Sequence, residues 1–164
     1  MDDHHARVWD IMERVGVCML TTRFADGLRA RPVEARPDRK NGVLYFVTDA
    51  RSGKEHEIAE HHEVGLTFVS TKDKAYLSIT GRAAVIDDRA RLAQIWKKTD
   101  TVWWPGGPDD PNARVLRVEL LTAELWDGPA SKAAAAYEFA KARMTGDKPN
   151  LGENRKVTVD MRER

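Results

Sequence analysis

The chain has 164 residues, of which 41% are hydrophobic and 32% charged, a composition typical of one globular domain with a proper core. Its 27 basic and 26 acidic residues leave a net charge of +1, so we expect neither nucleic acid nor a membrane surface as a partner. The single cysteine, Cys18, excludes a disulfide framework within the chain, and its apolar neighbours predict a small buried residue.

The N-terminal region predicts an amphipathic helix over residues 5–14, because Val8, Ile11, Met12 and Val15 recur at helical spacing. This region lacks the basic and apolar segments of a signal peptide, and no apolar run approaches the length of a bilayer span. Together with the lone cysteine, these features predict a cytoplasmic protein.

Period-two patterns then predict a series of strands separated by turns rich in Gly, Asn and Asp. Strands are expected at residues 17–22, 28–35, 43–48, 64–70, 75–86 and 114–126, and further helices at 53–62, 88–98 and 132–144. Gly81 interrupts the fifth strand and predicts a bulge or a bend there.

Six strands joined mainly by short turns predict a mainly β fold, an antiparallel sheet that closes into a small barrel with flanking helices. We expect a single domain over residues 1–145, which includes the C-terminal helix, followed by a polar and loosely held tail over 146–164.

The most informative stretch is LYFVTDARSGKEHEI, in which an apolar strand ends at Thr48 and a helix begins after Ser52. The first backbone N–H groups of a helix have no partner within it and so favour an anion. Gly53 allows a ligand close to the backbone, Lys54 adds a positive charge, and the two hydroxyls add donors. The pattern therefore predicts a site for a phosphorylated small molecule.

The same helix offers simpler interpretations. Ser52 and Glu55 fit a capping box, which forms at many helix starts that bind nothing. Its histidines and glutamates resemble metal ligands: His56, Glu57, Glu60, His61, His62 and Glu63. However, residues five apart on a helix diverge by more than about 100°, so His56 and His61 do not share a site. We expect a solvated helix face here and no metal.

Arg29, Arg31 and Val33 alternate along one predicted strand, so both guanidinium groups project from the same face. Pro32 has no N–H for a sheet ladder, which places this strand at an edge or beside a split in the sheet. The two arginines either bind a polar ring and its phosphate tail or form a solvated charged face.

The loop over residues 101–111 contains two adjacent tryptophans, Trp103 and Trp104, among glycines and prolines. Two consecutive tryptophans of a loop do not both fit one small core, so at least one is expected to pack on a partner subunit or a planar ligand. No Ser/His/Asp set and no carboxylate pair has a spacing typical of proton transfer.

Several of these motifs, in this order, resemble the flavin-binding split-barrel superfamily typified by pyridoxamine 5′-phosphate oxidase, and within it the general stress protein 26 group. The motifs are Arg31-Pro32-Val33, Phe46-Val47-Thr48, Ser52-Gly53-Lys54, Trp104-Pro105-Gly106-Gly107-Pro108, Asp110-Pro111 and Ala123-Glu124-Leu125-Trp126-Asp127. The resemblance covers residues 9–126.

The resemblance implies a homodimer of six-stranded split barrels with FMN at the subunit interface, or FAD in its place. The residues that it implies around the flavin are Arg29, Arg31, Pro32, Val33, Phe46, Val47, Thr48, Ser52, Lys54, Trp103, Trp104 and Trp126. In the oxidases an arginine stands where this chain has Gly53, so either Arg29 replaces this phosphate contact or the flavin is bound more weakly. The tryptophans are implied to reach the flavin from the partner subunit.

The chain departs from the oxidases beyond Trp126, where they carry arginines and a histidine for the vitamin B6 substrate and this chain has SKAAAA at residues 131–136. We therefore expect no pyridoxamine phosphate oxidase activity. Three functions stay open: an FMN-dependent oxidoreductase using reduced nicotinamide or another small donor, a non-catalytic flavin-sequestering stress protein, and the same fold with a deazaflavin or haem.

Overall fold

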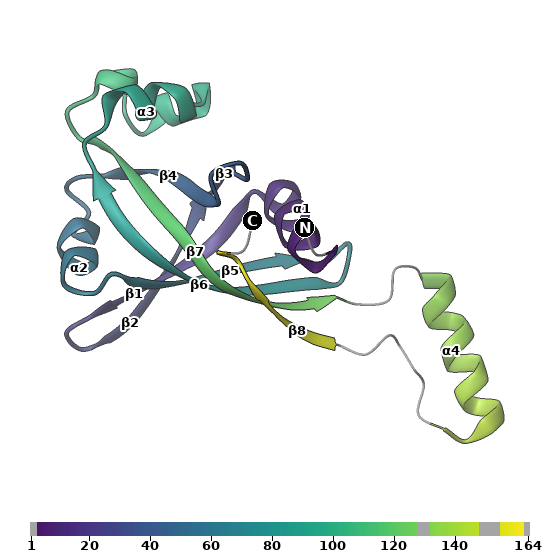
Figure 1. Cartoon of the computed structure of the whole chain (residues 1–164). Helices are drawn as coiled ribbons and strands as arrows, with labels where there is room; N and C mark the ends of the chain where they lie inside the picture. Colours follow the sequence, from purple (N-terminus) through teal and green to yellow (C-terminus); the bar gives the residue numbers. More distant parts are fainter. Residues whose placement is uncertain (1–2, 128–131, 148–154, 163–164) are drawn as a thin grey trace.

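Figure 1 shows the computed structural model of the chain, which describes residues 3–127, 132–147 and 155–162. The strands are β1 (Val17–Phe24), β2 (Gly27–Glu34), β3 (Arg36–Asp38), β4 (Val43–Asp49), β5 (Glu63–Ser70), β6 (Ala75–Ile86), β7 (Ala113–Asp127) and β8 (Arg155–Asp160). The helices are α1 (Asp3–Val15), α2 (Lys54–Glu60), α3 (Arg89–Ile95), α4 (Lys132–Thr145) and the short 3-10 helices η1 (Lys98–Val102) and η2 (Gly107–Asp109).

The strands form one twisted antiparallel sheet in the order β2-β1-β5-β6-β7-β4-β3, with β8 paired to β7. The predicted class, a mainly antiparallel β fold of the split-barrel type with flanking helices, is confirmed. β2 and β3 are the outer strands of this order, so the described strands do not close into the barrel that the sequence predicted. Helix α4 lies well away from the sheet (Figure 1).

The long strand β7 organises the sheet, because its first half pairs with β4 and its second half with β8, while β6 follows it along its other side. The register between β6 and β7 shifts at Gly81, which confirms the predicted irregularity. A Cβ at this position would lie 2.5 Å from Val118 Cγ1, so only glycine allows this close approach of the two strands.

The core lies against one face of the sheet, as the period-two patterns predict. Along β6 every second residue from Ala75 to Ala83 is buried, and the residues between them are exposed. Helix α1 covers this core with Val8, Trp9, Ile11 and Met12, each fully buried. The predicted amphipathic helix is therefore confirmed, and its apolar stripe is the surface that packs.

Two strands lie outside the six that the sequence predicted. β3 lies between the predicted strands over 28–35 and 43–48, and β8 lies in the predicted tail, so the expectation of a loosely held tail is wrong for Arg155–Asp160. The outer edge of β7 continues beyond β4 and offers backbone groups that need partners, which β8 supplies. Val159 and Met161 are buried in the core as a result.

A separate unit made of α3, η1 and η2 covers a second apolar cluster, in which Tyr45, Leu92 and Trp104 pack together. The predicted helix over 88–98 ends earlier, at Ile95, and Asp88 caps it. Within the described ranges, no helix combines the length and the apolar character needed to cross a bilayer.

Candidate functional site

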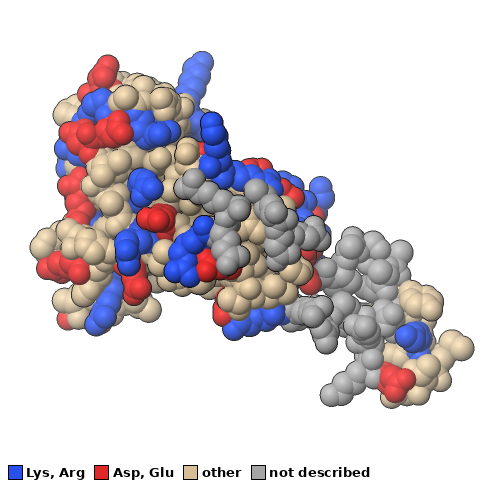
Figure 2. All heavy atoms as spheres, viewed as in Figure 1, with Lys and Arg blue, Asp and Glu red and all other residues tan. Residues whose placement is uncertain are grey.

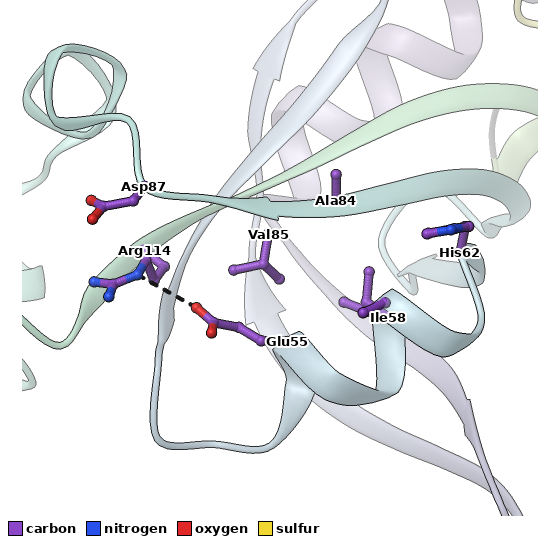
Figure 3. A pocket seen from close by; sticks show the side chains of 8 residues that line it. Glu55, Ile58, His62, Ala84, Val85, Asp87 and Arg114 are labelled. Carbon is purple, nitrogen blue, oxygen red and sulfur yellow. Dashed lines mark ion pairs between the residues drawn. The ribbon is translucent and has the colours of Figure 1, made fainter.

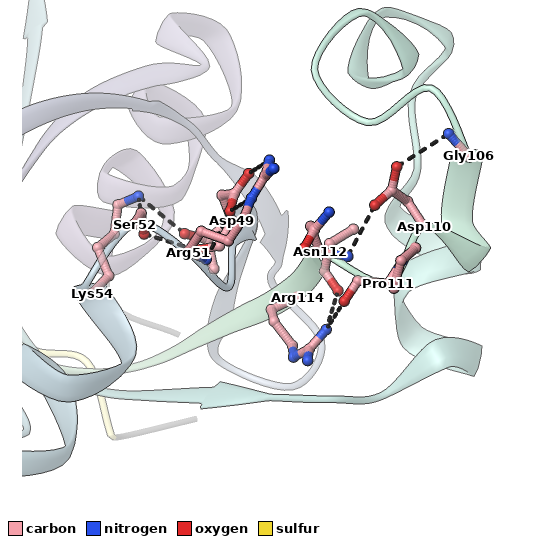
Figure 4. A network of polar contacts seen from close by, with 11 residues as sticks. Asp49, Arg51, Ser52, Lys54, Gly106, Asp110, Pro111, Asn112 and Arg114 are labelled. Atoms are coloured by element: carbon pink, nitrogen blue, oxygen red, sulfur yellow. Dashed lines mark hydrogen bonds and ion pairs between the residues drawn. The ribbon is translucent and has the colours of Figure 1, made fainter.

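The loop between β4 and α2 brings together three of the residues that the sequence predicted for a phosphate. The Lys54 ammonium donates to the Thr48 hydroxyl at 3.1 Å and to the Ser52 hydroxyl at 3.2 Å. The Ser52 hydroxyl donates to the Asp49 carbonyl oxygen at 2.7 Å and so tightens the loop (Figure 4). Two hydroxyls and one ammonium therefore meet at the end of β4.

The start of α2 is not a capping box. Gly53 is the N-cap, and no side chain caps the helix, so the simpler interpretation of Ser52 and Glu55 is wrong. Gly53 has φ of +76° and ψ of −9°, a left-handed conformation that favours glycine over every residue with a Cβ. This backbone favours a glycine between Ser52 and Lys54.

The charges around Lys54 are unbalanced. Burial lowers the pKa of Lys54, and the nearby Arg31 charge lowers it further, while Asp49 and Glu57 act in the opposite direction. Asp49 is itself engaged by Arg51, whose guanidinium lowers the pKa of that carboxyl to about 2. Lys54 is half-buried, and burial is the largest cause of its lowered pKa, so an anionic ligand beside it would favour the charged form.

Arg29 and Arg31 project from the same face of β2, as predicted, and converge on Glu57 of α2. Arg31 Nη2 donates to Glu57 Oε2 at 2.8 Å, and Arg29 Nη1 donates to Glu57 Oε1 at 2.9 Å. The Thr22 hydroxyl also donates to Glu57 Oε2, at 2.8 Å. The prediction of a solvated charged face is wrong for Arg31, whose side chain is only 17% exposed.

Glu57 is the residue that sequence reasoning missed. The sequence predicts a solvated helix face for Glu57 and the histidines, but Glu57 is only 9% exposed, so this prediction is wrong for Glu57. Burial alone favours its neutral form, yet the hydrogen bonds from Arg31 and Thr22 lower the pKa of Glu57 overall. The carboxylate is therefore ionised at neutral pH. Its partners lie far away in the sequence, so no local spacing could have revealed it.

Arg31 has a donor left over. Its Nε is buried and has no hydrogen-bond partner among the described atoms, although its Nη2 serves Glu57 and Thr22. An unpaired donor of a buried charged group is unfavourable and is rare in folded proteins. The arrangement therefore fits a site in which a ligand supplies an acceptor beside Arg31.

The other predicted residues lie along a gap in the sheet. Pro32 lies on β2 at the edge of the sheet, as predicted. β3 covers the outer side of β4 only from Val43 to Tyr45, so within the described structure the residues from Phe46 to Thr48 have β7 as their strand partner. β2 approaches β4, which brings these two incompletely paired strands close together.

The side chains on this stretch of β4 face apolar clusters. Phe46 is fully buried in the main core, and Val47 packs against the second cluster. Val33 of β2 packs against the main core. These three residues therefore leave their backbone groups, and not their side chains, for contact with a ligand at the gap.

The structure separates the tryptophans that the sequence could not distinguish. Trp104 is 8% exposed and packs edge to face on Trp96 with ring centroids 6.2 Å apart, whereas Trp103 is 73% exposed. Trp126 lies near the far end of β7, about 40 Å along the strand from Arg114 at roughly 3.3 Å per residue. Because Arg114 stands opposite Thr48, Trp126 is not part of the Lys54 cluster in one protomer.

A pocket of about 470 Å³ lies between α2 and β6, on another face of the same helix (Figure 3). Its floor is apolar, with Ile58 and Val85, and its rim carries an ion pair of Arg114 with Glu55 at 3.5 Å. None of the twelve predicted cofactor residues is among its described lining residues. Arg114 also donates to two backbone carbonyl oxygens, so its position is fixed by the loop before β7.

Other candidate chemistry finds no support among the described residues. Cys18 is buried as expected, and burial raises the pKa of its thiol to about 12, which keeps it protonated. No three His, Cys, Asp or Glu side chains of the described chain form a group that could hold a metal ion. His56 lies on the exposed side of α2, 3.2 Å from Glu60.

Comparison with protein-family models decides the family. The model described as pyridoxamine 5′-phosphate oxidase like matches residues 3–150. The chain belongs to this family. The match includes α1, the gap between β2 and β4, the Lys54 cluster and the loop that carries the two tryptophans.

Similar proteins are found among solved structures and curated proteins. A protein from Jannaschia sp. CCS1 assigned as a general stress protein 26 is 25% identical with a TM-score of 0.81, over 98% of this chain and 99% of that one. The general stress FMN/FAD binding protein of Xanthomonas citri is 25% identical with a TM-score of 0.69, over 77% and 90% of the two chains. The protein bli-3 of Neurospora crassa is 22% identical over 85% of this chain and 72% of its own length.

Proposed function

We propose that this chain is a flavoprotein that binds FMN, with its phosphate at the cluster formed by Ser52, Lys54 and Arg31. The observation that carries this proposal is the buried Arg31 Nε without a described partner, beside a half-buried lysine whose pKa is lowered by burial and by the Arg31 charge. A phosphate monoester supplies charge and acceptor oxygens to both groups. A relative from Xanthomonas citri that binds FMN or FAD supports the choice of flavin.

The isoalloxazine ring would lie along the gap between β2 and β4. Pro32 and Val33 border it on one side, and the uncovered backbone edge from Phe46 to Thr48 borders it on the other. When bound, the flavin supplies the redox chemistry, and the protein contributes binding, orientation and electrostatics. FAD fits the same arrangement if its second nucleotide half extends into solvent.

We further propose that two copies of the chain form the complete site. Tyr76 stands opposite both Val69 and Trp126 on the face of the sheet that points away from the core, and Val69 and Tyr76 are exposed. An apolar row of this kind on neighbouring strands is typical of a contact surface. The Trp126 of each protomer is too far away to touch the flavin of the same protomer. In a dimer, Trp126 or the exposed Trp103 of the second copy would reach it.

The dimer is tested by light scattering coupled to gel filtration. We expect the mass of two chains, and we expect Tyr76→Glu to elute as one chain because it places a charge beside Trp126 in the apolar row. A wild-type protein that elutes as a monomer at every concentration would contradict the dimer.

The activity that fits best is an FMN-dependent oxidoreductase that accepts electrons from reduced nicotinamide or another small donor, without vitamin B6 oxidation. The expectation of no vitamin B6 oxidation depends on residues 131–136. Of these, Ser131 and the side chains of residues 132–135 lie outside the described residues. On the face shown in Figure 2, acidic and basic side chains are interspersed, which suits a small-molecule ligand held in a local site.

The test begins with the absorbance spectrum of the protein as purified. A yellow protein that releases FMN on denaturation supports the proposal, whereas a haem or deazaflavin spectrum would contradict it. Anaerobic addition of NADH or NADPH then separates the two flavin functions. Bleaching without a separate reductase favours the oxidoreductase, and a flavin that stays oxidised with every donor favours the sequestering protein.

A further inference from the structure

The ion-pair cluster between β2 and α2 has a component that simple anion binding does not explain. A site for a phosphate gains from positive charge, yet Glu57 places a carboxylate among the cations, buried and ionised. Each of its oxygens holds a different arginine: Oε1 accepts from Arg29 and Oε2 accepts from Arg31. Because each oxygen binds one arginine, Glu57 can hold the two guanidinium groups in fixed positions.

The contacts of Glu57 engage one nitrogen of each guanidinium group. Arg31 uses Nη2 for Glu57 and for the Thr22 hydroxyl, at 2.5 Å, and its Nε meets no described acceptor. Arg29 uses Nη1, and its guanidinium also lies over the Phe24 ring at 4.4 Å from the centroid. Long arginine side chains lose much rotamer freedom when a ligand orders them, and a site ordered in advance avoids this loss on binding.

The charges of the cluster also match one ligand class. Arg29, Arg31, Arg51 and Lys54 carry four positive charges, and Glu57 and Asp49 remove two, which leaves two. A phosphate monoester carries about −1.5 to −2 at neutral pH, so it balances this remainder. A flavin without a phosphate brings no such charge and leaves the cluster uncompensated.

We propose that Glu57 is a positioning residue for the anionic end of the flavin. It holds Arg29 and Arg31 in one arrangement and thereby makes the site select phosphorylated flavins over those without phosphate. This inference rests on the proposed flavin function and goes beyond it, because it assigns the selectivity to a carboxylate that does not itself touch the ligand.

The experiment compares binding of FMN and riboflavin, measured by quenching of flavin fluorescence, in the apo-protein of the wild type and of Glu57→Gln. Wild type is expected to bind FMN more tightly than riboflavin. We expect Glu57→Gln to weaken the affinity for FMN by about tenfold or more, in line with the loss of charge-assisted hydrogen bonds. The affinity for riboflavin should change by less than about twofold. Glu60→Gln, an exposed carboxylate on the same helix, is the matched control and is expected to change neither affinity.

Each other result overturns the inference. If Glu57→Gln binds FMN as tightly as wild type or more tightly, the carboxylate only repels the phosphate. If the affinities for FMN and riboflavin fall equally, Glu57 supports the fold and not the selectivity for phosphorylated flavins. If this variant does not fold, Arg29→Gln on the edge strand takes its place, and an unchanged ratio of FMN to riboflavin affinity in that variant rejects the inference. A wild type that binds neither flavin rejects the proposed function itself.

Discussion

Arg36 and Arg31 each meet a buried carboxylate, and the two pairs differ in how fully the arginine is used. Arg36 donates through Nη2 to both oxygens of Asp100, at 2.8 and 3.0 Å. Its Nη1 and Nε donate to the carbonyl oxygens of Glu34 and Ile95. Arg31 in the Glu57 cluster leaves its buried Nε without a partner among the described atoms. The first pair is complete within the protein, and the second is not.

The difference indicates separate roles for two similar ion pairs. Arg36 and Asp100 connect β3 to η1 and so hold the unit of α3, η1 and η2 onto the sheet. A saturated buried pair of this kind stabilises an arrangement and has no capacity for a ligand. The Glu57 cluster lies at an edge of the sheet, and its unused donor and excess positive charge are consistent with ligand binding.

The largest effect is expected from breaking the saturated pair. Asp100→Ala leaves the Arg36 charge buried and unpaired, which should lower the free energy of unfolding by about 3–5 kcal/mol. Urea denaturation measures this loss. Asp109→Ala, an exposed acidic residue of η2, should change it by less than about 0.5 kcal/mol, and equal losses in the two variants would contradict the structural role of Asp100.

The next effect concerns the ligand and not the fold. Lys54→Ala should weaken FMN binding by roughly tenfold to a hundredfold, the value of a charge-assisted hydrogen bond to phosphate, with little loss of stability because burial already disfavours the Lys54 charge. Flavin fluorescence titration measures the affinity. Lys72→Ala, on an exposed turn, is the control. Flavin occupancy that stays unchanged in Lys54→Ala would place the phosphate elsewhere.

A smaller effect is expected from the left-handed backbone of Gly53, between Ser52 and Lys54. Gly53→Ala forces a Cβ into a left-handed conformation and should lower the free energy of unfolding by about 1–2 kcal/mol. Gly53→Asn should lower the free energy of unfolding by less, because asparagine tolerates the left-handed conformation better than alanine does. Thermal or urea unfolding separates the two variants, and an identical loss in both would point to a cause other than backbone conformation.

The smallest effect is a pH dependence at Glu57. Its folded-state pKa lies below the ordinary value of 4.5, so its stabilising contribution is fully present above that pH and is lost as pH falls through the folded pKa. The difference in unfolding free energy between wild type and Glu57→Gln should therefore shrink between pH 6 and pH 3. A difference that stays constant across this range would show that the carboxylate charge is not what stabilises the cluster.

Much of the local structure could be predicted from the sequence. The strands of β1, β4, β5, β6 and β7, the helix α1 and the irregularity at Gly81 follow from periods and turn residues within short windows. The meeting of Thr48, Ser52 and Lys54 also follows, since these residues lie within one strand–loop–helix junction. Two of the wrong predictions, the loosely held tail and the solvated Glu57, involve partners far apart in the chain. The capping box of Ser52 and Glu55 is wrong for a local reason, because the left-handed Gly53 is the N-cap.

What the sequence determined by itself is therefore the set of elements and the short-range cluster at Lys54, because both depend on neighbours a few residues away. Tertiary structure alone decided that Glu57 meets arginines 26 and 28 residues earlier in the chain. It also decided that Arg155–Asp160 completes the edge of β7. The physical reason is that burial and strand register select these contacts. The spacing of nearby residues does not reveal which distant segments pair.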